Sequence, residues 1–239
     1  MTKPIDHRKH YILVLDIETA NDIDDAIAYD LGFAIADRKG NIYEMHSLMI
    51  SEMFIDNKEM LKSAYYAEKL PSYWREYKKG ERKMVSLLTA RRMVYNLMKE
   101  YGIQEIFAYN ASFDYNGLNR TLRYLTKSKY RWFFPYGTKV NCIWHIACQT
   151  ILQQKAFFDF ALKNDLVKNG KVSTTAETAY RYICKDNTFT EAHTGLEDVK
   201  IETAILAKCY SQHKKIDTTI SHFCSALPQK KFKEFAKNA

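Results

Sequence analysis

The sequence predicts an α/β fold in which helices flank a mixed sheet, and three observations lead to it. Residues 11–16, YILVLD, form a continuous apolar run of strand length, which is typical of a strand buried on both faces. Two further apolar runs, 31–36 and 41–50, flank the sequence DRKG and predict a hairpin. After residue 80, helical and strand patterns alternate. A hairpin followed by such alternation predicts a sheet with both antiparallel and parallel strands.

The later elements are assigned from periodicity and end signals. Apolar residues recur at helical spacing over 81–101, ahead of a glycine, and predict an amphipathic helix. The strand 105–109 follows, and Asn110 is placed to cap a helix that starts near Phe113. Thr194 and Glu197 have the spacing of a capping box at the start of another helix.

Four more segments complete the prediction. They are a strand-to-helix piece over 139–152, a helix near 174–184, and insertions of helix or loop over about 51–80 and 153–173. The basic tail, about 212–239, is expected to be a loose helix from 228 onward.

Length and composition favour a single domain over residues 1–239, with its core at about 10–210. Residues 1–10 are polar and lack the apolar stretch of a secretory signal. No apolar run approaches the roughly 20 residues that span a bilayer, so no membrane partner is expected. Five cysteines without a Cys-x-x-Cys pair argue against a disulfide framework or a thiolate zinc site, and favour the cytoplasm.

The chain is basic, with a formal net charge of +8 and a pI near 9.1. Such a balance favours polyanionic partners, because lysine and arginine that neutralise phosphates release counterions. A basic protein that gathers several acids at one point usually holds cations there.

Three acid-bearing positions stand out, each at a strand end or a helix start. Asp16 and Glu18 are two residues apart in a strand, so their side chains share one face and repel each other unless a cation lies between them. Asp114 falls in the first turn of a helix, as does Asp198, and His193 precedes the latter on a loop. Each position also has a plainer interpretation: two solvated acids, two acids favoured by a helix dipole, and a surface histidine.

Together these residues resemble the DEDDh exonucleases, the superfamily of proofreading subunits and ribonuclease T, which have a ribonuclease-H-like fold. Three motifs occur in the family's order: Asp-x-Glu-Thr at 16–19, Asn-x-x-Phe-Asp at 110–114 and His-x4-Asp at 193–198. The resemblance covers roughly residues 10–210 and implies a five-stranded mixed sheet with helical insertions. Tyr182 and Asp186 offer the spacing of a tyrosine-bearing subclass, but an amphipathic helix follows Asp198 and none follows Asp186. The histidine subclass is therefore favoured.

The resemblance implies a 3′–5′ exonuclease that releases nucleoside 5′-monophosphates from single-stranded DNA or RNA. Two divalent ions, Mg²⁺ or Mn²⁺, would be held by the four acids, and His193 would be the general base. Thr19, Asn110 and Phe113 are candidates for contact with the terminal nucleotide. Replication or repair proteins are compatible partners. The alternative function is a non-catalytic nucleic-acid-binding or replication-partner module, although no expected acid is missing.

Two features lie outside the motifs. Where the family often has a small residue and glycine, this chain continues into an acidic loop with Asp22, Asp24 and Asp25. Basic and aromatic residues are interleaved over 73–79 and 127–132, a composition that suits single-stranded nucleic acid or, for the rings, a core.

Overall fold

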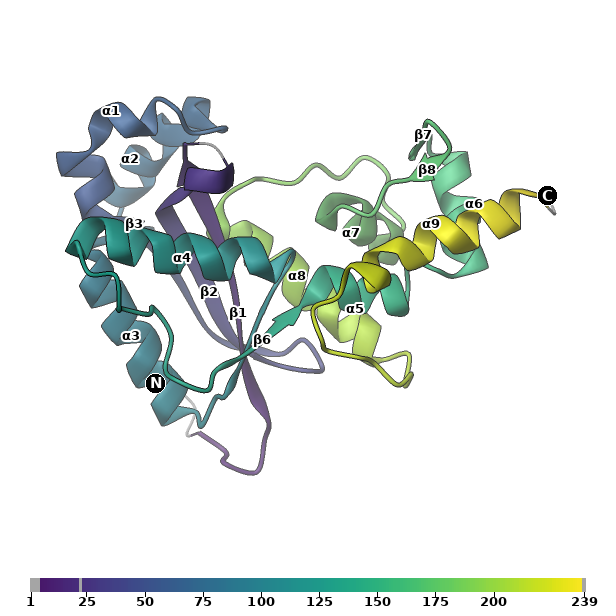
Figure 1. Cartoon of the computed structure of the whole chain (residues 1–239), viewed down its shortest axis with the longest axis horizontal. Helices are drawn as coiled ribbons and strands as arrows, with labels where there is room; N and C mark the ends of the chain where they lie inside the picture. The colour runs from purple at the N-terminus through teal and green to yellow at the C-terminus, as the bar shows by residue number, and fades with distance from the viewer. Residues whose placement is uncertain (1–4, 22, 238–239) are drawn as a thin grey trace.

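A six-stranded mixed sheet forms the centre of the computed structural model, which describes residues 5–21 and 23–237 (Figure 1). The strand order is β4-β3-β2-β1-β5-β6; β1 and β3 are antiparallel to β2, and the other neighbouring pairs are parallel. The predicted mixed sheet is thus confirmed, with one more strand than expected. The strands are β1 (Tyr11–Ala20), β2 (Ile27–Asp37), β3 (Ile42–Ile50), β4 (Lys83–Val85), β5 (Glu105–Ala108) and β6 (Lys139–Cys142).

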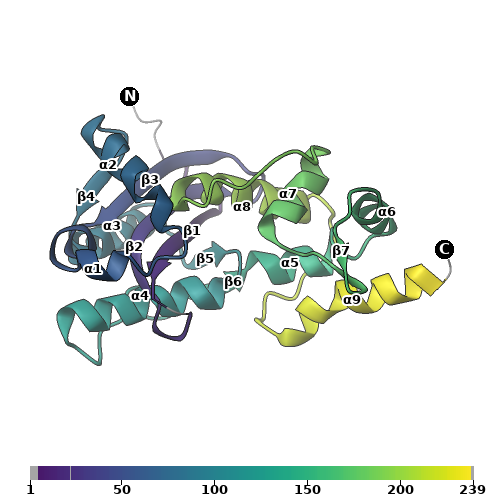
Figure 2. The ribbon, with the colours of Figure 1, turned by 90° about the horizontal axis from the view of Figure 1, so that it is seen from above.

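Two apolar cores lie on opposite faces of the sheet, because successive side chains of β1 point to opposite sides. Leu13 and Leu15 face the core beneath α3 (Leu87–Glu100) and α4 (Ala111–Thr126). Ile12 and Val14 face the second core. The helices of this second face, gathered beside the sheet in Figures 1 and 2, are α5 (Ile143–Gln149), α6 (Lys155–Lys163), α7 (Ala176–Cys184), α8 (Gly195–Tyr210) and α9 (His222–Lys237).

The C-terminal helix α9 is longer and better packed than the loose helix expected from residue 228. Phe232 is buried, and its ring centroid lies 5.5 Å from that of Phe158. Residues 238 and 239 of the predicted tail lie outside the described residues. In the part of the chain that the structure describes, no helix is both long and apolar enough to cross a membrane.

Three local predictions are corrected. Residues 83–85 pair in parallel with β3 instead of starting a helix, which begins at Leu87 after Ser86 accepts a hydrogen bond from Thr89 N (3.2 Å). Asn110 stands at the start of α4 in a left-handed conformation (φ 66°) and its side chain makes no cap hydrogen bond. Thr194 likewise makes none, and Glu197 pairs with Lys200 (2.6 Å), so the capping box is absent.

The two insertions are ordered. The first contains η2 (Glu52–Asp56), α1 (Lys58–Leu61), η3 (Ala67–Lys69) and α2 (Leu70–Lys78), and lies beside the end of β1 that leads into η1 (Ile23–Asp25) (Figure 1). The second contains α6 and a small hairpin of β7 (Val167–Lys168) and β8 (Lys171–Val172).

A buried carboxylate, Asp30 on β2, ties several elements together. Asp30 is fully buried and accepts hydrogen bonds from Arg82 Nη1 (2.9 Å), the Tyr73 hydroxyl (2.9 Å) and the Gly195 N–H (3.1 Å). The Arg82 guanidinium also stacks on the Tyr73 ring (4.0 Å) and donates to Glu76. A buried charge is tolerated only when it is paired and hydrogen-bonded in this way.

Replacing Arg82 with methionine should therefore destabilise the protein by about 3–5 kcal/mol, because Asp30 would remain buried without its cation. Urea unfolding followed by circular dichroism measures this loss. Arg8→Met is the matched control, since Arg8 is exposed and pairs only at the surface, and no measurable change is expected. A loss for Arg82→Met no larger than that of the control would contradict the assignment.

Candidate active site

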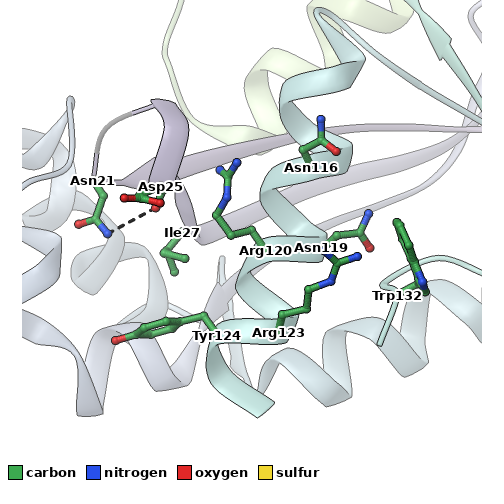
Figure 3. Close-up of a pocket in the computed structure, with 9 residues that line it drawn as sticks. All are labelled: Asn21, Asp25, Ile27, Asn116, Asn119, Arg120, Arg123, Tyr124 and Trp132. Carbon is green, nitrogen blue, oxygen red and sulfur yellow. Dashed lines mark hydrogen bonds between the residues drawn. The ribbon is translucent and has the colours of Figure 1, made fainter. Parts of the chain in front are cut away.

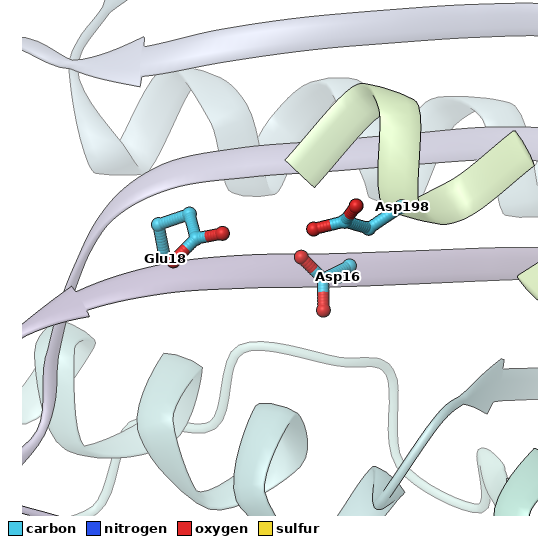
Figure 4. A group of neighbouring side chains, drawn as sticks. All are labelled: Asp16, Glu18 and Asp198. Atoms are coloured by element: carbon cyan, nitrogen blue, oxygen red, sulfur yellow. The ribbon is translucent and has the colours of Figure 1, made fainter. Parts of the chain in front are cut away.

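Three carboxylates converge where β1 passes the start of α8. Asp16 and Glu18 project from β1 and Asp198 from the first turn of α8 (Figure 4). One ligating oxygen from each lies within 4.8 Å of the others. Of the described residues, these three form the group of acids, histidines or cysteines close enough to hold one metal ion.

Strand geometry places the first two acids. Asp16 and Glu18 lie on the same side of β1 as Ile12 and Val14, which face the core that contains α8. A β-bulge follows directly, since Glu18 pairs with Asp30 but Thr19 pairs with Ala28. Bulges bend a strand and increase its twist, so the strand changes course immediately after its second acid.

A close backbone contact sets the position of Asp198. The start of α8 lies directly on β2, where a Cβ on Gly32 would be 2.0 Å from the carbonyl carbon of Gly195. Only glycine allows so near an approach at both positions. Gly32 is the register partner of Asp16, so the contact brings the first turn of α8 over the first acid.

Asp114 joins the cluster from the opposite side of the sheet. It is buried in the first turn of α4, and its Oδ1 accepts a hydrogen bond from the Ile17 N–H (3.2 Å). This bond holds the start of α4 against β1 between Asp16 and Glu18. The structure thus brings together all four acids of the three motifs.

A fifth acid, Glu202, was not predicted. It is 2% exposed, and a carboxyl oxygen accepts a hydrogen bond from the Tyr109 N–H. Its negative charge acts on Asp16, and that of Asp114 acts on it. One signal was present in the sequence: Glu202 follows Asp198 by four residues, so both acids lie on one face of α8.

Burial and mutual repulsion keep these acids from ionising easily. Burial raises the pKa of Glu18 to about 9 and that of Asp198 to about 8, with further increases from Asp198 and Glu191 respectively. Burial alone raises the pKa of Asp114 to about 8. Burial, reinforced by Asp114, raises the pKa of Asp16 and Glu202 well above the usual range.

The cluster fits hard divalent cations. One carboxyl oxygen in each of four acids is buried without a hydrogen-bond partner among the described residues, namely in Asp16, Asp114, Asp198 and Glu202. Buried polar atoms are rarely left unpaired, and a missing ion is one explanation. Carboxylate oxygens are the ligands that Mg²⁺ and Mn²⁺ prefer.

His193 borders the cluster and is held by the first insertion. Its ring stacks on Tyr66 (centroids 4.3 Å apart, 12° between planes), and its backbone N–H donates to the Asp198 carboxylate. Lys69 donates to the Ala192 carbonyl and lies over the Tyr66 ring at 4.7 Å. Burial, with a contribution from Lys69, lowers the pKa of His193, so the imidazole is neutral at neutral pH.

Tyr182 and Asp186, the alternative motif of the tyrosine-bearing subclass, lie away from the carboxylates. The Tyr182 ring packs on Phe157 and Phe160, with centroids 5.2 and 5.5 Å apart. Asp186 is exposed and accepts hydrogen bonds from Thr188. Neither belongs to the group of converging carboxylates.

The three residues expected to contact the terminal nucleotide lie next to elements that carry the acids. Thr19 follows the bulge, Asn110 is left-handed at the start of α4, and Phe113 packs partly buried on the core beneath that helix. Asp24 is exposed, as is Asp25, whereas Asp22 lies outside the described residues.

No protein-family model matches the chain, and no curated protein matches its sequence. Among solved structures, the chain is similar to the zinc-ion-bound form of an E. coli ExoI–ssDNA complex, with a TM-score of 0.47 and 13% sequence identity. The match covers 82% of this chain and 39% of that one, so this chain spans well under half of that structure's length.

Without divalent cations, the protein should lose stability as the pH rises from about 4 to about 8. The acids ionise near pH 4 in the unfolded chain, but Asp114 and Asp198 do so only near pH 8 when folded. The folded state therefore holds more protons in this window, and its stability falls as the pH increases. Thermal unfolding in EDTA should show this decrease, and Mg²⁺ should raise the melting temperature more at pH 8 than at pH 5. A melting temperature that ignores Mg²⁺ at both values would contradict the metal site.

Glu202→Gln should raise the melting temperature in EDTA near pH 8 by several degrees. The amide replaces a carboxyl that the folded protein has to keep protonated well above its ordinary pKa, and so removes that cost. The same substitution should reduce the stabilisation that Mg²⁺ provides. Glu197→Gln is the matched control on the same helix, since Glu197 is exposed and pairs with Lys200. A lower melting temperature for Glu202→Gln than for wild type in EDTA would show that the acid serves packing rather than the metal site.

Proposed function

We propose that this protein is a metal-dependent 3′–5′ exonuclease that acts on single-stranded DNA or RNA. The observation that carries the proposal is the convergence of Asp16, Glu18 and Asp198, with Asp114 held against the same strand by the Ile17 N–H. Three of these four acids have a buried oxygen without a partner among the described residues. Acting from the 3′ end is what the resemblance of the three motifs to those of the DEDDh exonucleases implies. The basic character of the chain supports a polyanionic substrate.

In this proposal the acids hold two Mg²⁺ or Mn²⁺ ions. Glu18 and Asp198 would complete one site and Asp114 the second, with Asp16 shared between them. Such a pair of ions supplies Lewis acidity, lowers the pKa of water and stabilises the charge of the departing oxygen. The chain itself contributes rigid placement: the Ile17 hydrogen bond orients Asp114, and the Gly32–Gly195 contact fixes the height of α8 over β1.

His193 is proposed as the general base. A neutral imidazole accepts a proton from the attacking water, and the lowered pKa of His193 keeps it in this form at neutral pH. Nε2 is proposed as the accepting atom, because the Glu191 carboxyl, 3.9 Å from Nδ1, favours a proton on Nδ1. Stacking on Tyr66 limits rotation of the ring and so orients Nε2.

Three residues that are close to the acids in sequence are proposed to contact the terminal nucleotide, namely Thr19, Asn110 and Phe113. The released product would be a nucleoside 5′-monophosphate. The first insertion, through Tyr66 and Lys69, borders the same region and so shapes access to it.

The test is digestion of 5′-labelled single-stranded DNA and RNA with Mg²⁺, with Mn²⁺ and with chelator. Stepwise shortening from the 3′ end is expected, with none in chelator. Asp16→Asn should abolish shortening, and His193→Gln should slow it about 10²-fold or more, the usual contribution of a general base. Asp186→Asn and Tyr182→Phe are controls that should keep the wild-type rate, since both residues lie outside the cluster.

Wild-type protein that shortens neither polymer, while still binding both, would instead favour the non-catalytic nucleic-acid-binding module. A rate lost in Tyr182→Phe and kept in His193→Gln would overturn the role given to His193.

A further inference from the structure

A basic and aromatic surface covers the outer side of α4, away from the carboxylates. A hollow of about 630 Å³ has Asn116, Arg120 and Arg123 of α4 along its floor, with Asn21 and Asp25 on one side and Trp132 on the other (Figure 3). A second hollow of about 570 Å³ also includes Trp132 and continues along the loop after α4. We call this continuous surface the α4 groove; the residues that define it are Asn116, Arg120, Arg123, Tyr130, Arg131 and Trp132.

Aromatic rings in the groove are exposed although large rings are usually covered. Tyr130 is 90% exposed and Trp132 is 52% exposed. The other basic and aromatic stretch of the sequence differs, because Tyr73 is fully buried against Asp30 and Arg82. Of the two stretches in which such residues are interleaved, only the one at 127–132 therefore presents a pair of rings that are each more than half exposed.

Trp132 is held in a fixed orientation. Its ring stacks on Tyr115 (centroids 6.3 Å apart), which stacks in turn on the buried Phe134 (5.7 Å). Arg91 donates to the Trp132 carbonyl (2.8 Å), and the Arg123 guanidinium lies 4.5 Å from the centre of the indole ring. A ring ordered in advance loses little entropy when a ligand stacks on it.

The charges of the groove suit a polyanion. Four arginines and one acid, Asp25, are among the described residues that line the two hollows. Guanidinium groups contact phosphates, and exposed aromatic rings stack on unpaired bases of any sequence. Cations beside exposed rings are typical of a surface that binds single-stranded nucleic acid. An acidic protein as the partner would explain the arginines but not the exposed rings.

The groove and the candidate active site share two segments of the chain. Asn21, which lines the groove, follows Glu18 by three residues, and Asp114 lies in the first turn of the helix whose outer face forms the floor. From Asp114 to Arg123 is nine residues, or ~14 Å along α4. A strand whose end lies at the carboxylates can therefore reach the groove a few nucleotides away.

We propose that the α4 groove binds single-stranded nucleic acid, with bases stacked on Trp132 and Tyr130 and phosphates at Arg120, Arg123 and Arg131. The inference rests on the proposed function for its substrate class. The groove would bind those nucleotides of the substrate strand that are distant from the hydrolysed bond. Binding at this surface does not require hydrolysis.

Binding is measured by fluorescence anisotropy in EDTA, with labelled oligo-dT and oligo-U of about 20 nucleotides and with labelled trinucleotides. We expect Trp132→Ala to weaken binding of the long probes about tenfold, the loss of one stacked base, and Arg123→Gln to reduce the salt dependence by about one phosphate contact. Trinucleotides, which are too short to join both regions, should bind all variants alike.

Arg38→Gln is the matched control, because its guanidinium also lies over an aromatic ring, that of Tyr210 at 4.9 Å, on the opposite face of the sheet. Melting temperatures verify that each variant is folded, and Trp132→Phe, which keeps a ring, should lose less than Trp132→Ala. Wild-type affinity in both Arg123→Gln and Trp132→Ala would overturn the groove, even if the protein is an active exonuclease. Weakened binding in a protein that cleaves nothing would support the groove and refute the proposed activity.

Discussion

The structure depends on one buried charge. Asp30 receives hydrogen bonds from the first insertion, from the segment before α3 and from the start of α8, so a single carboxylate joins three parts of the chain that are distant in sequence. Its desolvation is compensated by Arg82 and by the Gly195 N–H. Asp198 is on α8, and Asp16 and Glu18 are on β1. The hydrogen bonds to Asp30 therefore help to set the geometry of the carboxylate cluster, because they hold the start of α8 against the sheet.

Sequence patterns predicted the elements whose signals are local. The apolar run of β1, the hairpin and the spacing of Asp16 and Glu18 need only the period of a strand, and the structure places all of these as expected. Pairing with distant partners was not predictable: residues 83–85 read as helical but add an edge strand to β3. Glu202 was missed for a similar reason, since an acid inside an amphipathic helix looks solvated until the packing of the helix is known.

The charge of the molecule is divided rather than uniform. Five acids are gathered at the end of β1 within a chain whose formal net charge is +8. The first insertion brings Lys69 close enough to lower the pKa of Glu18 and Asp198 against the larger effect of their burial. Residues 51–80 therefore belong to the electrostatics of the cluster, although they lie outside the three motifs.

The order in which the cluster is built along the chain has a consequence for synthesis. Asp16 and Glu18 emerge from the ribosome early, whereas Asp198 and Glu202 come about 180 residues later and reach β1 only when α8 docks on Gly32. Contacts so distant in sequence form late in folding. A nascent or truncated chain that lacks α8 carries the first acids without their partners, so the completed centre cannot exist before synthesis has passed Glu202.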